Sequence, residues 1–119
     1  MKMGKAKIFG LRNCDKCRLA LRKLMDIGID VELIDLRKVP LTIEKIEEMC
    51  ALYGDAILNS RSTTYRGLSL SEKNASTISL LQKYPALMKR PVILAISHNS
   101  IGWSEGILKE WEALVSKSS

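Results

Sequence analysis

Residues 7–36 pass from a strand pattern to a helix pattern and back, and this order constrains the fold more than any other feature of the sequence. Residues 7–10 and 31–36 are apolar and partly β-branched, as strands are. Between them apolar residues recur at helical spacing until Gly28, a plausible C-cap. Strand, helix and strand within about 30 residues form a βαβ unit, so we expect the two strands to be parallel.

The middle of the chain predicts helices only. Thr42 is a candidate N-cap for a helix over residues 43–53, which Gly54 stops. Residues 55–88 show no alternating strand pattern. Short helical stretches at 56–58, 71–81 and 85–88 are expected there, with a Ser/Thr-rich connection at 61–67.

The last third predicts an antiparallel strand pair and a final helix. Residues 91–96 (PVILAI) give the strongest strand pattern in the chain. Residues 98–100 have turn chemistry, so residues 101–103 can return as a short antiparallel strand. A helix from about 104 to 115 follows.

The order βαβ, helical insert, ββα predicts an α/β fold of the thioredoxin-like, glutaredoxin type, a mixed four-stranded sheet with an inserted helical subdomain. A chain of 119 residues suits one domain, 1–119, with the insert at roughly 42–89. With 46% apolar and 27% charged residues, the chain can bury a core and does not have the composition of a disordered tail.

The cysteine count and the net charge indicate the cellular compartment and the classes of partner to expect. Three cysteines are an odd number, which favours the reducing cytoplasm over a secreted disulfide scaffold. No apolar run approaches the roughly 20 residues that span a bilayer, so no membrane partner is expected. The net charge of +6 comes from mostly isolated basic residues with few aromatic ones, so direct nucleic-acid binding is not expected either. An anionic small substrate, a thiolate or a solvated basic surface each explains the charge.

The chemistry of the chain centres on a CxxC motif. Asn13 occupies a position where a capping side chain is common, which puts Cys14 in the first helical turn and Cys17 on the same face. The positive end of a helix lowers the pKa of a thiol, so Cys14 is the expected nucleophile and Cys17 the expected resolving thiol. Arg18 lies four residues after Cys14, close enough to stabilise a thiolate or an anion.

Other interpretations of the cysteines stay open. Cys17 can be a small core residue, in which case Cys14 needs an external thiol. A zinc site is not expected, because no second CxxC or CxxH accompanies the first. Cys50 shares helical spacing with apolar residues, which favours a core position, and His98 lies in a polar turn and is assigned no role.

Four separated segments, 10–18, 58–66, 84–91 and 101–103, resemble the arsenate reductase (ArsC) family and its Spx-type regulator branch. Residues 10–15 (GLRNCD) look like the cysteine loop of ArsC-like proteins, and residues 14–18 (CDKCR) are similar to the CxxCR of the Spx branch. Residues 58–66 resemble the family's central basic segment. Residues 84–91 match its P-x-L-[IM]-x-R-P motif, and residues 101–103 resemble its short strand ending in a Gly-aromatic pair. The resemblance extends over nearly the whole chain, since these segments are spread from residue 10 to residue 103.

The resemblance implies a thioredoxin-like fold and a thiol-dependent oxidoreductase. In the reductases a cysteine, matched by Cys14, attacks arsenate held by arginines, and Arg90 matches the arginine before the family's proline. Pro91 is expected to follow a cis peptide bond. No bound cofactor is expected, and glutathione or glutaredoxin is the expected reductant. Asn13 is a further candidate substrate-binding residue.

The sequence departs from the reductases at the remaining arginines. Arg61 is the nearest candidate for the central arginine, although alignment through Tyr65 places Asn59 there. The reductases have a further arginine after the third strand, whereas this chain has none beyond Arg90. Arg12 or Arg66 can compensate, or both can be solvated surface residues.

The sequence therefore leaves three alternative functions. The first is a thiol oxidoreductase that acts on a small oxyanion or a thiol substrate. The second, favoured by the CxxC pair, is an Spx-type redox-sensing regulator that binds RNA polymerase. The third is a structural domain whose site is vestigial.

Overall fold

The computed structural model describes residues 5–118. The chain divides into two compact units: Met1–Val39 with Arg90–Ser119 form the first, and Pro40–Lys89 form the second. The second unit contains helices and no sheet strand, and its residues are nearly those of the insert expected at 42–89. That the whole chain is one domain stays a prediction.

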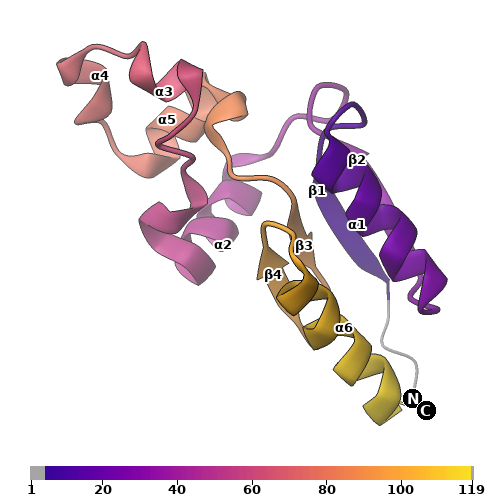
Figure 1. Cartoon of the computed structure of the whole chain (residues 1–119). Helices are drawn as coiled ribbons and strands as arrows, with labels where there is room; N and C mark the ends of the chain where they lie inside the picture. The colour runs from indigo at the N-terminus through magenta and orange to yellow at the C-terminus, as the bar shows by residue number, and fades with distance from the viewer. Residues whose placement is uncertain (1–4, 119) are drawn as a thin grey trace. The chain divides into compact units, whose positions relative to one another are not determined.

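The first unit contains a mixed four-stranded sheet (Figure 1). The strands lie in the order β2-β1-β3-β4, with bounds β1 Ala6–Gly10, β2 Val31–Asp35, β3 Val92–Leu94 and β4 Asn99–Ile101. β1 pairs parallel to β2 and antiparallel to β3, and β4 pairs antiparallel to β3. The predicted parallel βαβ unit and mixed α/β sheet of the thioredoxin type are confirmed.

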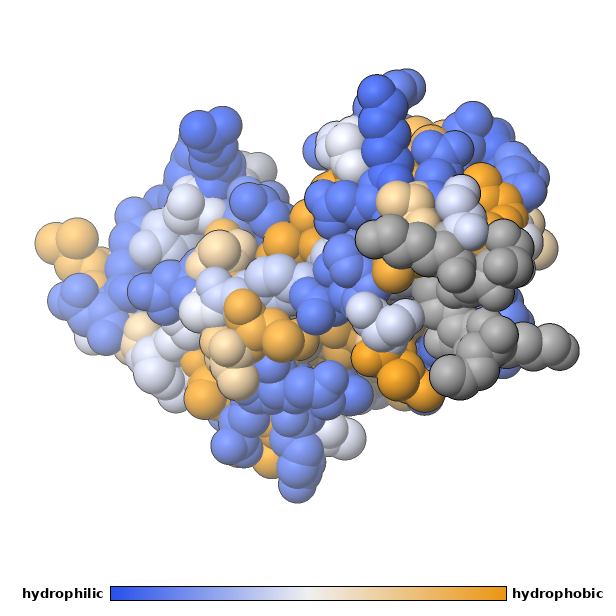
Figure 2. Space-filling view, turned by 90° about the horizontal axis from the view of Figure 1, so that it is seen from below, coloured by the Kyte–Doolittle hydropathy of each residue, from blue (hydrophilic) through white to orange (hydrophobic). Residues whose placement is uncertain are grey.

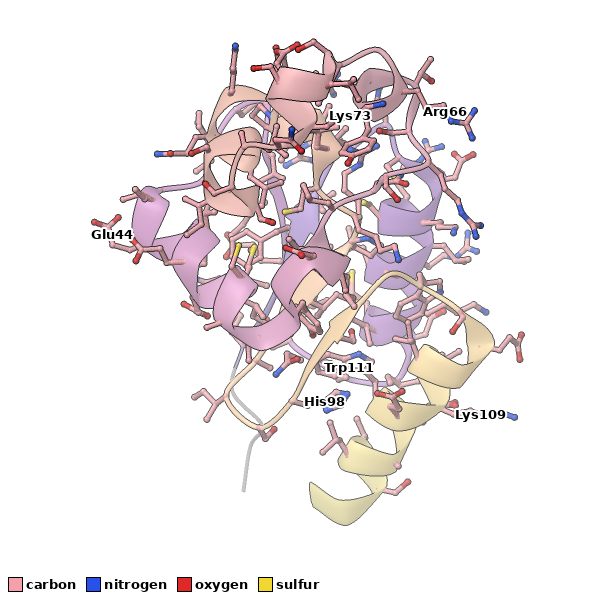
Figure 3. The ribbon with its side chains drawn as sticks, turned by 90° about the vertical axis from the view of Figure 1, so that its left-hand side faces the viewer. Glu44, Arg66, Lys73, His98, Lys109 and Trp111 are labelled. Atoms are coloured by element: carbon pink, nitrogen blue, oxygen red, sulfur yellow. The ribbon has the colours of Figure 1, made fainter. Side chains whose placement is uncertain are left out.

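Two helices, α1 (Asp15–Asp26) and α6 (Glu105–Ser118), lie on one face of this sheet (Figure 1). The core between them and the sheet consists of side chains that alternate along the strands or recur along the helices: Ala6, Ile8, Ala20, Leu24, Ile29, Ile93 and Trp111. The buried indole N–H of Trp111 donates to the Ser100 hydroxyl at 3.0 Å, so this polar group is satisfied. The ring of His98 stands edge-on to Trp111, with centroids 4.8 Å apart (Figure 3).

The second unit consists of short helices and turns. Its elements are α2 Ile43–Tyr53, η1 Gly54–Ile57, α3 Thr63–Arg66, α4 Leu70–Lys73, α5 Thr77–Lys83 and η2 Pro85–Leu87. α2 packs against α5. Thr42 caps α2 as predicted, because its hydroxyl accepts the Lys45 N–H at 3.1 Å, and Gly54 ends it at positive φ.

The prediction of one helix over 71–81 and a loop over 61–67 was wrong. α3 lies inside the predicted loop, and the predicted helix is split into α4 and α5. The cause is local capping: Ser69 and Glu72 form a reciprocal capping box that starts α4, and the Ser76 hydroxyl accepts the Ser79 N–H and starts α5. Glu72 also accepts from the Tyr84 hydroxyl, which joins α4 to the end of α5.

Of the last two strands, β3 is shorter than predicted and β4 is shifted by two residues. β3 ends at Leu94 rather than residue 96, and Ile96 is 91% exposed. β4 begins at Asn99, inside the predicted turn, and ends at Ile101. The turn therefore lies earlier than its composition indicated, at residues 95–98, where the Ala95 N–H bonds the His98 carbonyl at 2.9 Å.

On the face seen in Figure 2, hydrophilic side chains surround separate hydrophobic patches. Within residues 5–118, no helix combines the length and the apolar character needed to cross a bilayer.

Candidate functional site

The CxxC motif lies where the central strand β1 passes into α1. β1 ends at Gly10, and the Cys14 N–H bonds the Leu11 carbonyl at 3.1 Å, which closes a turn over residues 11–14. Cys14 has extended backbone (φ −89°, ψ 121°) and is itself the N-cap of α1, its carbonyl accepting the Arg18 N–H at 3.0 Å. The expectation that Asn13 caps the helix was wrong by one residue, and Asn13 is exposed.

The Cys14 sulfur lies at the positive end of α1. It makes no capping hydrogen bond of full geometry, yet the N–H groups of Cys17 and Lys16 face it. Partial burial raises the pKa of the Cys14 thiol, but these N–H groups, the Cys17 thiol and the Arg90 side chain outweigh burial and lower the pKa below its ordinary value. The half-exposed Cys14 sulfur is therefore the activated one.

Cys17 has the opposite environment. Its side chain is fully buried. Burial raises the pKa of the Cys17 thiol to about 11, and the neighbouring Cys14 adds to the increase. Both cysteines are free thiols here, and the Cys17 thiol donates toward Cys14. Cys17 thus packs in the core and also contacts Cys14, and its role as the resolving thiol stays a prediction.

Gly10 makes room for the Cys17 sulfur. A Cβ at position 10 would lie 2.3 Å from Cys17 Sγ and 3.4 Å from Cys17 Cβ, and the first distance is closer than non-bonded atoms approach. φ at Gly10 is not positive, so the glycine is required by space and not by backbone conformation. Sequence reasoning used Gly10 only as part of a motif and missed this role, because it depends on where α1 places the sulfur.

Arg90 lies beside both sulfurs, and Pro91 lies next to Gly10, its Cβ 4.0 Å from where a Cβ at Gly10 would be. The Arg90–Pro91 peptide bond is cis, as predicted, and Pro91 is buried. The Arg90 side chain hydrogen-bonds to Cys14, and its charge also acts on Cys17. Arg90 is half-buried, and its Nε is shielded from solvent. A guanidinium placed in this way can stabilise a thiolate or bind an oxyanion next to it.

Arg18 makes a different contact from the one expected. Its guanidinium donates to Asp15 Oδ1 at 2.6 Å, and the two side chains are 62% and 92% exposed. The groups that lower the pKa of Cys14 come from Cys17, Lys16 and Arg90 instead. A catalytic role for Arg18 stays a prediction.

Asp35 is a residue that sequence reasoning missed. It ends β2, directly across from Gly10 in the parallel register, and is 4% exposed. Its carboxylate accepts the N–H of Arg37 at 3.0 Å and that of Arg12 at 3.3 Å, so it holds the loop that leads to Cys14. The hydrogen bond from the Arg37 N–H is the main cause that lowers the pKa of Asp35. A mostly apolar strand segment that contains an acidic residue at its end was the available signal.

The remaining candidates belong to the second unit. Arg61 and Arg66 are both exposed, and Arg66 extends outward from α3 (Figure 3). The Arg61 N–H bonds the Asn59 side chain at 3.3 Å, which shapes the turn before α3. The site in the first unit therefore contains Cys14, Cys17, Arg90 and Pro91, and substrate contacts by Arg61 and Arg66 stay predictions.

Within residues 5–118, no three His, Cys, Asp or Glu side chains are grouped closely enough to hold a metal ion. Cys50 is half-buried on α2, and burial and then the charge of Asp55 raise the pKa of its thiol. His98 Nε2 contacts Glu110 Oε1 at 3.1 Å on the side of the sheet that carries α6. Neither residue adds to the site.

The model of the ArsC family matches residues 9–117. An uncharacterized protein of Haemophilus influenzae is 35% identical over 111 residues, which are 89% of this chain and 95% of that protein. An arsenate reductase of Neisseria meningitidis serogroup A is 28% identical and covers 84% of this chain and 92% of its own length. The global transcriptional regulator Spx of Listeria innocua is 25% identical, and the match covers 83% of this chain and 80% of that protein.

Solved structures share the fold. A YffB protein superposes with a TM-score of 0.82 at 23% identity, covering 92% of this chain and 98% of its own. An arsenate reductase from Vibrio cholerae superposes with a TM-score of 0.77 at 20% identity and the same coverage. At these identities the structures establish the architecture, and the chemistry has to be argued from the residues themselves.

Proposed function

Since the chain belongs to the ArsC family, we propose that it is a thiol oxidoreductase in which Cys14 is the nucleophile and Cys17 the resolving thiol. The contrast between the two sulfurs supports this most. Despite partial burial, N–H groups and Arg90 lower the pKa of Cys14, whereas burial raises that of Cys17 to about 11. Near neutral pH, the accessible sulfur is thus the more ionised one.

The proposed reaction is thiol–disulfide exchange. The Cys14 thiolate attacks one sulfur of a disulfide RS–SR′, a bond to RS forms, and R′S⁻ leaves and takes up a proton. Cys17 then loses its proton and attacks Cys14 Sγ, which forms the Cys14–Cys17 disulfide and releases RS⁻. The substrate gains two electrons and the dithiol loses them. Glutathione, alone or through glutaredoxin, reverses the exchange and restores the dithiol.

The two steps suit the electrostatics of the pair. In the mixed disulfide Cys14 has no negative charge, so its contribution to the high pKa of Cys17 disappears. The resolving thiol therefore ionises more readily once the first step has occurred. The order of the two steps, attack by Cys14 and then by Cys17, therefore follows from the electrostatic effect of Cys14 on the pKa of Cys17.

Arsenate is the first substrate to test, because a relative named arsenate reductase covers 84% of this chain. In its reduction two thiols become one disulfide, arsenic gains two electrons, and one oxygen leaves as water. Arg90 next to Cys14 supplies a guanidinium suited to an oxyanion. Arg61 and Arg66 are the proposed further contacts, since no arginine follows Arg90.

The test is arsenate reduction and disulfide reduction with glutathione, with and without glutaredoxin, in the wild type, Cys14→Ser and Cys17→Ser. Cys50→Ser is the matched control, because Cys50 is the third cysteine of the chain and lies in the second unit. We expect Cys14→Ser to abolish activity and Cys50→Ser to retain it. Activity that survives in Cys17→Ser identifies a cycle in which glutathione resolves Cys14. A wild type that reduces neither substrate contradicts the proposal.

An Spx-type regulator that binds RNA polymerase is the second candidate, favoured by the CxxC pair and by the 25% identity to Spx. In this function the Cys14–Cys17 disulfide is a switch and not a turnover intermediate. Specific capture of purified RNA polymerase that depends on the redox state, by a protein without reductase activity, supports the regulator over the enzyme.

A further inference from the structure

Asp35 is a buried carboxylate at the end of β2. Among the side chains that the structure describes, it is the only charged one that is buried, at 4% exposure. Burying a carboxylate costs free energy unless hydrogen bonds compensate it, and an apolar side chain would avoid this cost. Its Oδ2 accepts from the Arg12 N–H at 3.3 Å and its Oδ1 from the Arg37 N–H at 3.0 Å. The carboxylate therefore joins the loop before α1 to the loop after β2.

This carboxylate lies where β1 and β2 stop pairing. Asp35 is opposite Gly10 in the parallel register, and the Leu36 N–H bonds the Gly10 carbonyl at 2.9 Å. From there the chain leaves β1 for the turn over residues 11–14. The hydrogen bond from the Arg12 N–H to Asp35 thus links the two segments beyond the end of the strand pair.

The peptide group between Leu11 and Arg12 connects Asp35 to Cys14. Its N–H donates to the Asp35 carboxylate, and its carbonyl accepts the Cys14 N–H at 3.1 Å. The peptide is trans and planar, so its N–H and its C=O point in opposite directions and turn together. A carboxylate that fixes the direction of the N–H therefore also fixes the direction of the carbonyl that holds Cys14.

We propose that Asp35 is a positioning residue for the Cys14 nucleophile and acts through the Leu11–Arg12 peptide. This role rests on the proposed function, in which the Cys14 sulfur attacks the substrate. It adds a group on β2 that keeps the backbone of Cys14 in the conformation from which the sulfur reacts.

The backbone conformation of Cys14 matters because N–H groups of α1 act on its sulfur. Cys14 is the extended N-cap of α1, and the N–H groups of Lys16 and Cys17 face the sulfur. Without the anchor at Asp35 the turn becomes looser, and the sulfur lies beside these N–H groups for less of the time. Loss of the Asp35 charge has the opposite effect, because a nearby negative charge disfavours a thiolate. The sign of the change therefore separates positioning from charge.

The test is the rate at which iodoacetamide alkylates Cys14, measured over a range of pH to give the pKa of this thiol. The full chain carries Cys50→Ser, and Cys17 is fully buried, so Cys14 is the thiol that reacts. We expect Asp35→Ala to raise the pKa of Cys14 and to slow alkylation at pH 7 about 2- to 10-fold, the equivalent of one hydrogen bond. Glu32→Ala is the matched control, because it removes an exposed carboxylate from the same strand, and it should leave the rate unchanged.

Three results overturn the positioning role. An unchanged pKa of Cys14 in Asp35→Ala, even with a lower free energy of unfolding, leaves Asp35 a structural residue only. Faster alkylation in Asp35→Ala shows that its charge acts on the sulfur and its hydrogen bond does not. An equal loss of rate in Glu32→Ala indicates a general effect of β2. A wild type whose Cys14 titrates as an ordinary thiol contradicts the proposed function instead.

Amide hydrogen exchange in the wild type tests the same contact without a substitution. We expect the amides of Arg12 and Cys14 to be protected, because they donate to Asp35 and to the Leu11 carbonyl. In Asp35→Ala the protection of both should fall together. Exchange of the Arg12 amide in the wild type at the rate of an unfolded chain overturns the positioning role, whether or not Asp35→Ala folds.

Discussion

Replacing Gly10 by alanine tests how closely the strand and the buried sulfur are fitted together. The new Cβ would lie 2.3 Å from Cys17 Sγ, and an ordinary contact begins at 3.4 Å, so the sulfur or the strand has to move by at least 1.1 Å. Cys17 is 0% exposed and packs in the core, so little free space receives it. Overpacking of this size costs about 1–3 kcal/mol. For 119 residues that corresponds to a Tm lower by about 4–12 °C.

A double-mutant cycle, with the free energy of unfolding measured in urea, tests whether the clash with Cys17 Sγ causes this loss of stability. Cys17→Ala removes the sulfur, after which the nearest atom to the new side chain is a Cβ at 3.4 Å, an ordinary contact. In that background we expect Gly10→Ala to cost less than about 0.5 kcal/mol, so the coupling energy between the two positions is about 0.5–3 kcal/mol. An equal cost of Gly10→Ala in both backgrounds would refute the steric argument.

Two further predictions concern the thiols. Arg90→Gln should raise the pKa of Cys14 and slow its alkylation by iodoacetamide at pH 7 several-fold. Lys89→Gln removes the same charge at the preceding residue and should leave the alkylation rate unchanged. Equal alkylation rates in the wild type and both variants contradict the contact between Arg90 and Cys14. The pKa of Cys17 rises from 9.0 to about 11 on folding, so the protonated thiol is favoured in the folded state and its contribution is complete below pH 9. Unfolding free energy should therefore fall as pH rises from about 9 through about 11, and the fall should be smaller in Cys17→Ala.

The sequence predicted the sheet and α1 because their patterns are local. Apolar alternation in β1 and β2 with a helical stripe between them leaves few alternatives to a parallel pair. The cis bond at Pro91 was predicted by resemblance alone and is confirmed. The split between α4 and α5 was missed, although the Ser69-x-x-Glu72 capping box that starts α4 is visible in the sequence.

The site was predicted less completely than the fold. The CxxC motif identified both cysteines, but which one is buried depends on how α1 packs on the sheet. The close approach of Gly10 to Cys17 and the hydrogen bond from the Arg12 N–H to Asp35 join residues that are 7 and 23 positions apart, and no local pattern predicts such contacts. The cap shifted from Asn13 to Cys14 because the turn over residues 11–14 fixes the first helical residue.

The Asp35 carboxylate, which holds the loop before Cys14, affects how that loop behaves in mild acid. The pKa of Asp35 is lowered, chiefly by the Arg37 N–H, so this carboxylate keeps its charge further into acid than an ordinary aspartate does. The hydrogen bonds that it accepts from the N–H groups of Arg12 and Arg37 are therefore expected to persist over the same range. Mild acid should thus leave the backbone before Cys14 in place.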